Sequence, residues 1–140
     1  MTTITFRVDC PPMGKERPRF AGGHSYTPKR TKEYEEKIKR AFQKAVEESG
    51  ITFFPTDQRV RIECVALFGI PQSAKRKRMP DKILAGVPCV KVPDIDNILK
   101  IVQDALNKIA YLDDRQIWEG MAKKIYSDLP GLEITLEVEM

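Results

Sequence analysis

The chain has 140 residues, of which 41% are hydrophobic and 31% are charged, and its formal net charge is +4. These values predict one domain, residues 1–140, with a packed core, and they exclude a disordered chain. A single histidine excludes metal sites built on several histidines, and three cysteines without a CxxC pair argue against a disulfide framework or a zinc site. We expect a cytoplasmic protein without a signal peptide or a membrane span.

The first half of the chain predicts a strand, a loop, a helix and a second strand. Apolar and polar residues alternate over residues 4–8, which indicates a half-buried strand that ends at two prolines. Residues 13–30 are predicted to form a basic loop. Apolar residues recur at helical spacing from about residue 31 to Ser49, where Gly50 supplies a stop. Alternation over residues 60–68 predicts the second strand.

The second half predicts a long basic loop over residues 72–92, a helix over about 97–109, and strands over 116–126 and 132–138. The order is therefore β-α-β-α-β-β. We expect an α+β fold, with two helices on one face of a small mixed or mainly antiparallel sheet of about four strands.

Acidic residues gather around the start of the second helix. Asp94 and Asp96 stand two residues apart, followed by Lys100 and Asp104 at helical spacing. One carboxylate is expected to cap the helix, and Lys100 and Asp104 are compatible with an ordinary surface pair. Carboxylates two apart on an extended segment, however, project to the same side and can face one ion.

The ion that these residues favour is a hard divalent cation, which binds oxygen ligands. A calcium loop is excluded, because Leu99 and Ala105 stand where that loop needs glycine and glutamate. A cluster of carboxylates without histidine, in a basic chain, indicates a metal-dependent reaction at a phosphodiester bond. A bound metal offsets phosphate charge and activates water for attack.

The same region carries a longer motif with fixed spacing. It comprises the sequence PDIDN at residues 93–97, Lys100, DALN at 104–107, YLDD at 111–114, and Gln116-Ile117. In this motif the chain resembles the RusA-type Holliday-junction resolvases, which are small homodimeric Mg²⁺-dependent endonucleases of bacteria and their prophages. A weaker upstream match at residues 12–20 and 26–28 is typical of the phage-like branch of that family.

The resemblance implies a function in DNA recombination and repair, with paired cuts that resolve a four-way junction. It implies that Asp94, Asp96 and Asp114 bind the metal, Mg²⁺ with Mn²⁺ as the alternative, and that Lys100 is catalytic. Asp104 and Asp113 match supporting acidic positions. A four-way junction has two-fold symmetry, so we expect a homodimer with one active site per chain. We expect Asp114 to reach the site of its own chain, with the partner's site as the alternative.

Two basic groups are candidate DNA contacts, namely Lys15, Arg17 and Arg19 in the first loop and Lys75, Arg76, Lys77 and Arg78 in the second. Phe20 and Tyr26 are compatible with base stacking or with core packing. Three rival functions stay open: a metal-dependent nuclease for forks or flaps, a junction-binding protein without catalysis, and a scaffold protein with surface acids.

Overall fold

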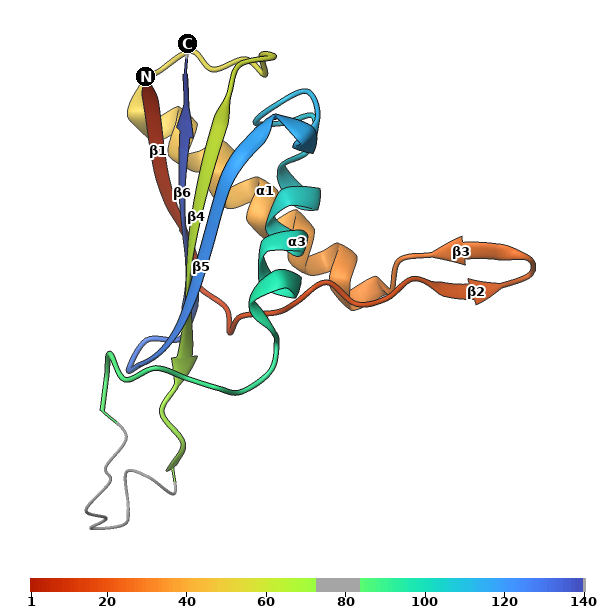
Figure 1. The fold of residues 1–140 in the computed structure, drawn as a ribbon, viewed down its shortest axis with the longest axis vertical. Coiled ribbons are helices and arrows are strands. Elements are labelled where there is room, and N and C mark those ends of the chain that lie inside the picture. The colour runs from red at the N-terminus through yellow and green to blue at the C-terminus, as the bar shows by residue number, and fades with distance from the viewer. Residues whose placement is uncertain (73–83, 140) are drawn as a thin grey trace.

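A computed structural model describes residues 1–72 and 84–139 (Figure 1). The basic run at residues 75–78 lies outside the described residues. The elements in chain order are β1 (Thr2–Val8), β2 (Arg19–Ala21), β3 (His24–Tyr26), α1 (Lys29–Ser49), β4 (Val60–Gly69), α3 (Ile95–Leu106), the short 3-10 helix η1 (Asp114–Gln116), β5 (Ile117–Ser127) and β6 (Gly131–Val138). In the described part of the chain, no helix has the length and apolarity needed to cross a membrane.

Four strands form one mixed sheet in the order β1-β6-β4-β5. The β1–β6 and β6–β4 pairs are antiparallel, whereas β4 and β5 are parallel. A parallel pair needs a long crossover, and the segment that contains α3 provides it. Helices α1 and α3 both lie on one face of the sheet (Figure 1). The predicted α+β fold, with two helices on one face of a mixed sheet, is confirmed.

The core lies between this sheet face and the two helices. Helix α1 contributes Ile38 and Phe42, and helix α3 contributes Ile98, Ile101 and Val102, all of them at most 2% exposed. Facing them are alternate residues of the strands, such as Ile62 and Cys64 of β4 and Ile134 and Leu136 of β6. Burial on this scale raises the pKa of the Cys64 thiol to about 12, so this cysteine is a neutral core residue.

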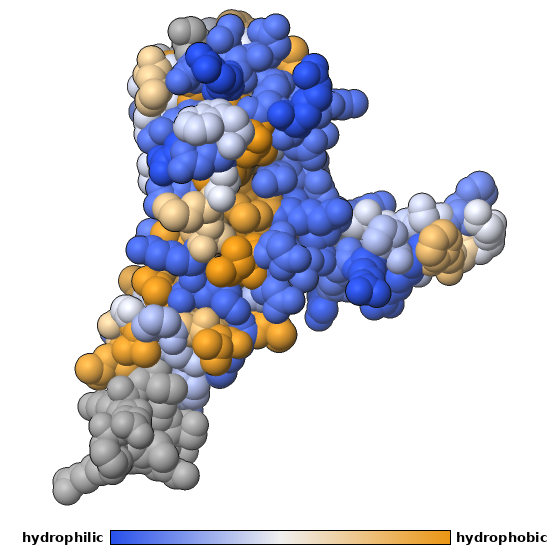
Figure 2. Space-filling view, viewed as in Figure 1, coloured by the Kyte–Doolittle hydropathy of each residue, from blue (hydrophilic) through white to orange (hydrophobic). Residues whose placement is uncertain are grey.

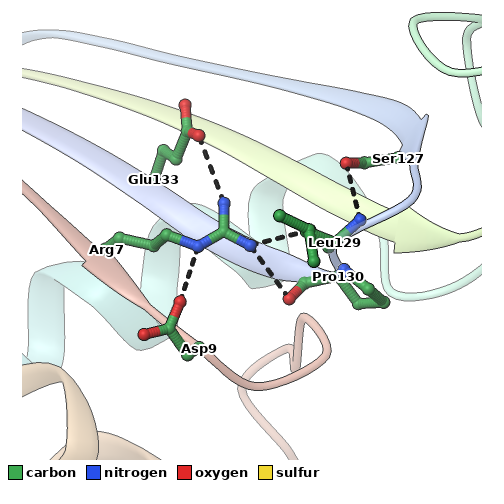
Figure 3. Close-up of polar contacts among 6 residues, drawn as sticks. All are labelled: Arg7, Asp9, Ser127, Leu129, Pro130 and Glu133. Atoms are coloured by element: carbon green, nitrogen blue, oxygen red, sulfur yellow. Dashed lines mark hydrogen bonds and ion pairs between the residues drawn. The ribbon is translucent and has the colours of Figure 1, made fainter.

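Arg7 holds the end of β1 to the start of β6 and to the turn before it (Figure 3). Its guanidinium donates to the carboxylates of Asp9 at 2.6 Å and Glu133 at 3.2 Å, and to the carbonyl oxygen of Leu129 at 2.7 Å. A Cβ atom at Gly131 would lie only 2.6 Å from this guanidinium, so only glycine permits the approach. Arg7 therefore orders the turn that leads into β6.

Two predictions about elements are wrong in detail. Helix α3 spans Ile95–Leu106, so it begins two residues earlier and ends three residues earlier than predicted. The predicted loop at residues 13–30 contains the β2–β3 hairpin, which projects away from the body (Figure 1). The hairpin was missed because its strands have three residues each and bury none of them, so that they show no periodicity.

Candidate active site

A hollow of about 340 Å³ lies between α3 and the loop that follows it. It is lined by Asp96, Leu99, Lys100, Gln103, Asp104 and Asp114. Five of these residues recur on one face of α3, because residues three and four apart are neighbours on a helix. Asp96, Lys100 and Asp114 are exposed to solvent. The structure thus brings three predicted site residues and the predicted supporting residue Asp104 into one pocket of one chain, and it adds Gln103.

Asp114 reaches this pocket because α3 is short. From Asp96 to Leu106 the helix rises only about 15 Å. The eight residues from Leu106 to Asp114 can span up to about 27 Å, which is enough to return along the helix. The return starts at Lys108, whose φ of 66° is left-handed, and the backbone of Asn107 pairs with that of Tyr111. Asp114 therefore lines the pocket of its own chain.

Asp94 occupies a different position from the one expected. It is the N-cap residue of α3, yet its side chain makes no capping hydrogen bond within the described residues. The prediction that Asp94 and Asp96 share an extended segment is wrong, because the helix already begins at Ile95. Asp94 lines an adjoining hollow of about 440 Å³, together with Lys15, Glu16, Arg30 and Asn97. Its carboxylate is exposed and unused by the helix cap.

Lys15 connects both helices beside the pocket. Its ammonium lies 2.5 Å from a carboxylate oxygen of Glu35 on α1 and 3.2 Å from one of Asp104 on α3. Burial lowers the pKa of Lys15, but the hydrogen bonds and charges of these two carboxylates outweigh it and the pKa is raised overall. Lys15 is therefore a charged residue that neutralises Asp104 at the edge of the pocket, rather than a free surface lysine.

The loop that carries Lys15 packs tightly on the start of α3. The Lys15 amide donates to the carbonyl oxygen of Asn97 at 3.0 Å. A Cβ atom at Gly14 would lie 2.7 Å from Pro93 and 2.9 Å from Asn97, which real Cβ contacts do not allow. Glycine is thus required at residue 14 for the loop to touch the helix, and this contact joins the basic loop to the acidic pocket.

Tyr111 is a core residue close to Asp104 and Asp114. Its side chain is fully buried, and its hydroxyl donates to the carbonyl oxygen of Gln103 at 2.6 Å. Burial, and then the negative charges of Asp114 and Asp104, raise the pKa of the Tyr111 hydroxyl. The tyrosine therefore stays neutral and links the middle of α3 to the returning loop.

The loop before β5 is held by Gln116 and Asp113. The Asp113 carboxylate accepts from the backbone amide of Arg115 at 2.9 Å, and the side-chain Oε1 of Gln116 accepts from the backbone amides of Leu112 and Asp113 at 2.9 Å. The side-chain Nε2 of Gln116 donates to the backbone carbonyl oxygens of Thr56 and Gln58, both at 2.7 Å. The side chains of Asp113 and Gln116 form a capping box at the start of η1, and Asp113 therefore has a structural role.

Replacing Gln116 by Ala is expected to destabilise the protein by about 2 kcal/mol, because four hydrogen bonds to backbone groups are lost. The loop that presents Asp114 would loosen as well. Urea unfolding measures the loss of stability. Gln43→Ala, at an exposed position of α1, is the control and should change stability by less than about 0.5 kcal/mol. Normal stability of Gln116→Ala would contradict the role of these hydrogen bonds.

The donor atoms of the pocket suit a hard cation. They are oxygens of Asp96, Asp104, Asp114 and Gln103, without histidine or cysteine. In residues 1–72 and 84–139, no three acidic, histidine or cysteine side chains are close enough to form a complete metal cage. Mg²⁺ does not need one, since one or two carboxylates, waters and a phosphate usually hold it. The chemistry of these donors therefore suits a hard divalent cation held partly by water.

The candidate DNA contacts have different surroundings. Arg17 and Arg19 are exposed at the base and first strand of the hairpin, and the nearest carboxylate oxygen of Glu16 is 3.8 Å from Arg19. Lys15 is already paired, as described above. The second candidate group, Lys75, Arg76, Lys77 and Arg78, lies outside the described residues. Arg17 and Arg19 are thus the exposed members of the two candidate groups among the described residues.

The class of protein follows from comparison with known families: the chain is a nuclease. Residues 9–137 match the family model described as Endodeoxyribonuclease RusA, and the chain belongs to that family. A curated relative, "Uncharacterized protein YqaN" of Bacillus subtilis (strain 168), is 31% identical over an alignment 140 residues long, and the alignment covers 97% of this chain and 96% of that protein. The sequence-based recognition of the RusA family is confirmed.

Proposed function

We propose that this nuclease resolves four-way DNA junctions by divalent-metal-dependent hydrolysis of phosphodiester bonds, in recombination and repair. The observation that carries the proposal is the shared pocket of Asp96, Asp114 and Lys100 in a chain of the RusA family. A pair of carboxylates beside an exposed lysine suits the binding and hydrolysis of a phosphodiester. The carboxylates attract a cation and the lysine attracts the phosphate.

In the proposed reaction, water attacks the phosphorus and the bond from phosphorus to the 3′-oxygen breaks, which leaves a 5′-phosphate and a 3′-hydroxyl. A bound Mg²⁺, with Mn²⁺ as the alternative, lowers the pKa of water and offsets phosphate charge. Asp96 and Asp114 would supply oxygen ligands from the pocket, and Asp94 would supply one from the adjoining hollow. Lys100, one helical turn after Asp96, would hold the phosphate and stabilise its developing negative charge.

The proposed active form is a homodimer. Each chain carries one such pocket, whereas resolution of a junction needs two cuts placed symmetrically. A two-fold dimer matches the symmetry of the junction and supplies both sites. Because Asp114 lines the pocket of its own chain, we propose that each site is formed within one subunit.

The proposal is tested by incubating the purified protein with a mobile four-way junction, with Mg²⁺ and with EDTA. We expect paired cuts with Mg²⁺ and intact DNA with EDTA. A fork, a flap and a linear duplex of the same sequence are the comparison substrates. Faster cutting of forks or flaps would favour the rival nuclease. Junction binding without any cutting would favour a binding protein, and neither binding nor cutting would leave a scaffold protein.

Binding of the junction should fall steeply with salt, since Arg17, Arg19 and other basic residues would displace counterions from phosphates. Six such contacts would weaken binding about 10³-fold between 50 and 200 mM salt. Titrations without divalent metal at several salt concentrations measure the slope. An affinity that does not change with salt would contradict phosphate contacts.

A further inference from the structure

The β2–β3 hairpin and the residues that join it to the body, residues 17–28, form an arm whose strands take no part in the core. All six strand residues, Arg19–Ala21 and His24–Tyr26, are exposed. Two-residue turns between such strands need positive φ angles, and Gly22 and Gly23 supply them at 58° and 79°. A two-stranded hairpin without further packing is at best marginally stable in water. A contribution to the stability of the fold therefore does not explain why the chain has this arm.

The arm and its junction with α1 carry charge of one sign. Residues 17–30 contain Arg17, Arg19, Lys29 and Arg30 and no carboxylate, while the whole chain has a net charge of +4. Glu16, just before the arm, accepts from Arg30 at 2.7 Å. The arm protrudes with a mostly hydrophilic surface that holds a small hydrophobic patch (Figure 2). This charge favours a polyanion as the partner.

Aromatic side chains accompany the basic ones. Phe20 is 80% exposed and Tyr26 is 44% exposed, so the alternative that they pack in the core is wrong. The register pairs Arg19 with Tyr26 and Phe20 with Ser25 across the hairpin. Paired residues share a face and neighbours along a strand alternate, so Phe20 and Tyr26 lie on opposite faces. Exposed aromatic rings among basic residues are the combination that binds unstacked bases and their phosphates.

The root of the arm borders the hollow that Asp94 lines. This hollow is also lined by Lys15, Glu16 and Arg30, which flank the arm in the sequence, and by Asn97 from α3. The hydrogen bond from the Lys15 amide to Asn97 anchors this root on the helix. A DNA strand held by the arm would therefore continue along the hollow toward Asp94 and the neighbouring pocket.

We propose that the arm binds unpaired or unstacked bases of branched DNA, with Phe20 stacking on a base and Arg17 and Arg19 contacting phosphates. The inference rests on the proposed function, because it takes a branched DNA as the substrate. A second copy of this chain is the competing occupant, but its net charge has the same sign as that of the arm. Charge complementarity therefore favours DNA.

The test measures DNA binding by the full chain without divalent metal, using a four-way junction with 2-aminopurine at its centre and a continuous duplex. Phe20→Ala should weaken junction binding about tenfold, the scale of one lost base–aromatic stack, and remove the fluorescence change. Duplex binding should stay as in the wild type. Phe20→Trp should retain both the junction affinity and the fluorescence change, since it keeps an aromatic face. The control Phe54→Ala removes a phenylalanine that is 67% exposed outside the arm and should behave as wild type.

The double variant Arg17→Ala, Arg19→Ala should weaken binding to both DNAs and lower the salt slope by about two. The arm inference is overturned if Phe20→Ala binds the junction with wild-type affinity and fluorescence. It is also overturned if that variant changes the oligomeric state in sedimentation while DNA binding persists, which would indicate arm exchange between chains.

Parallel cleavage assays separate this inference from the proposed function. If the wild type does not cut the junction with Mg²⁺ but Phe20→Ala loses binding, the proposed function fails and the arm inference stands. If the wild type cuts and Phe20→Ala binds and cuts equally well, the proposed function stands and the arm inference fails.

Discussion

Replacing Asp96 by Asn is expected to abolish cleavage while junction binding stays unchanged or becomes tighter. Asp96 lies in the first turn of α3 and its side chain is exposed in the pocket shared with Asp114. The amide has the same shape but lacks the charge that would hold a cation next to a phosphate. We expect the cleavage rate to fall at least about 100-fold, the scale of one lost electrostatic contact in a transition state.

Folding should change little in this variant, because the helix dipole loses only about 0.3–1 kcal/mol of favourable interaction. Single-turnover cleavage with Mg²⁺ gives the rate, and titration without metal gives the affinity. Asp128→Asn is the matched control: it removes the same charge in the turn after β5. The 11 residues of that strand place this turn about 33 Å from its start. If Asp96→Asn cuts at the wild-type rate, the assignment of the site is wrong.

The main elements of the fold were predictable because their apolar residues follow one clear period. Strand β6 alternates strictly, and α1 carries one apolar stripe that ends at Gly50, whose φ is 71°. Alternation shows which face of a strand is buried but not which strand lies beside it. The parallel pairing of β4 with β5 was therefore left open, between a mixed and a mainly antiparallel sheet.

The sequence predicted which residues belong to the candidate site, but it predicted their spatial arrangement only in part. Apolar Ile109 favoured a longer helix, yet it packs against the core from the returning loop after α3 has ended. That earlier end brings Asp114 back to Asp96. The early start of α3 separates Asp94 from the same pocket. Tyr111 and Gln116 belong to the recognised motif, but their roles became clear only from their hydrogen bonds to the backbone of Gln103 and Thr56.

Tyr111 is the residue whose loss should affect stability most. Replacing it by Ala removes a fully buried ring and leaves a cavity in the core. Such truncations of large aromatic residues cost about 3–5 kcal/mol, against a total stability of about 5–15 kcal/mol for a typical domain. Tyr111→Phe keeps the ring and loses only the hydrogen bond to Gln103, so it should cost about 1 kcal/mol.

Urea unfolding of both variants separates the contribution of the ring from that of the hydroxyl. Tyr26→Ala, at a partly exposed position of the arm, is the control and should stay within about 0.5 kcal/mol of the wild type. Equal losses in Tyr111→Phe and Tyr111→Ala would mean that the hydroxyl, not the ring, supports the fold. A loss below about 1 kcal/mol in Tyr111→Ala would contradict its place in the core. Since the ring supports the loop that returns Asp114 to the pocket, Tyr111→Phe should still cleave DNA, whereas Tyr111→Ala should lose cleavage together with stability.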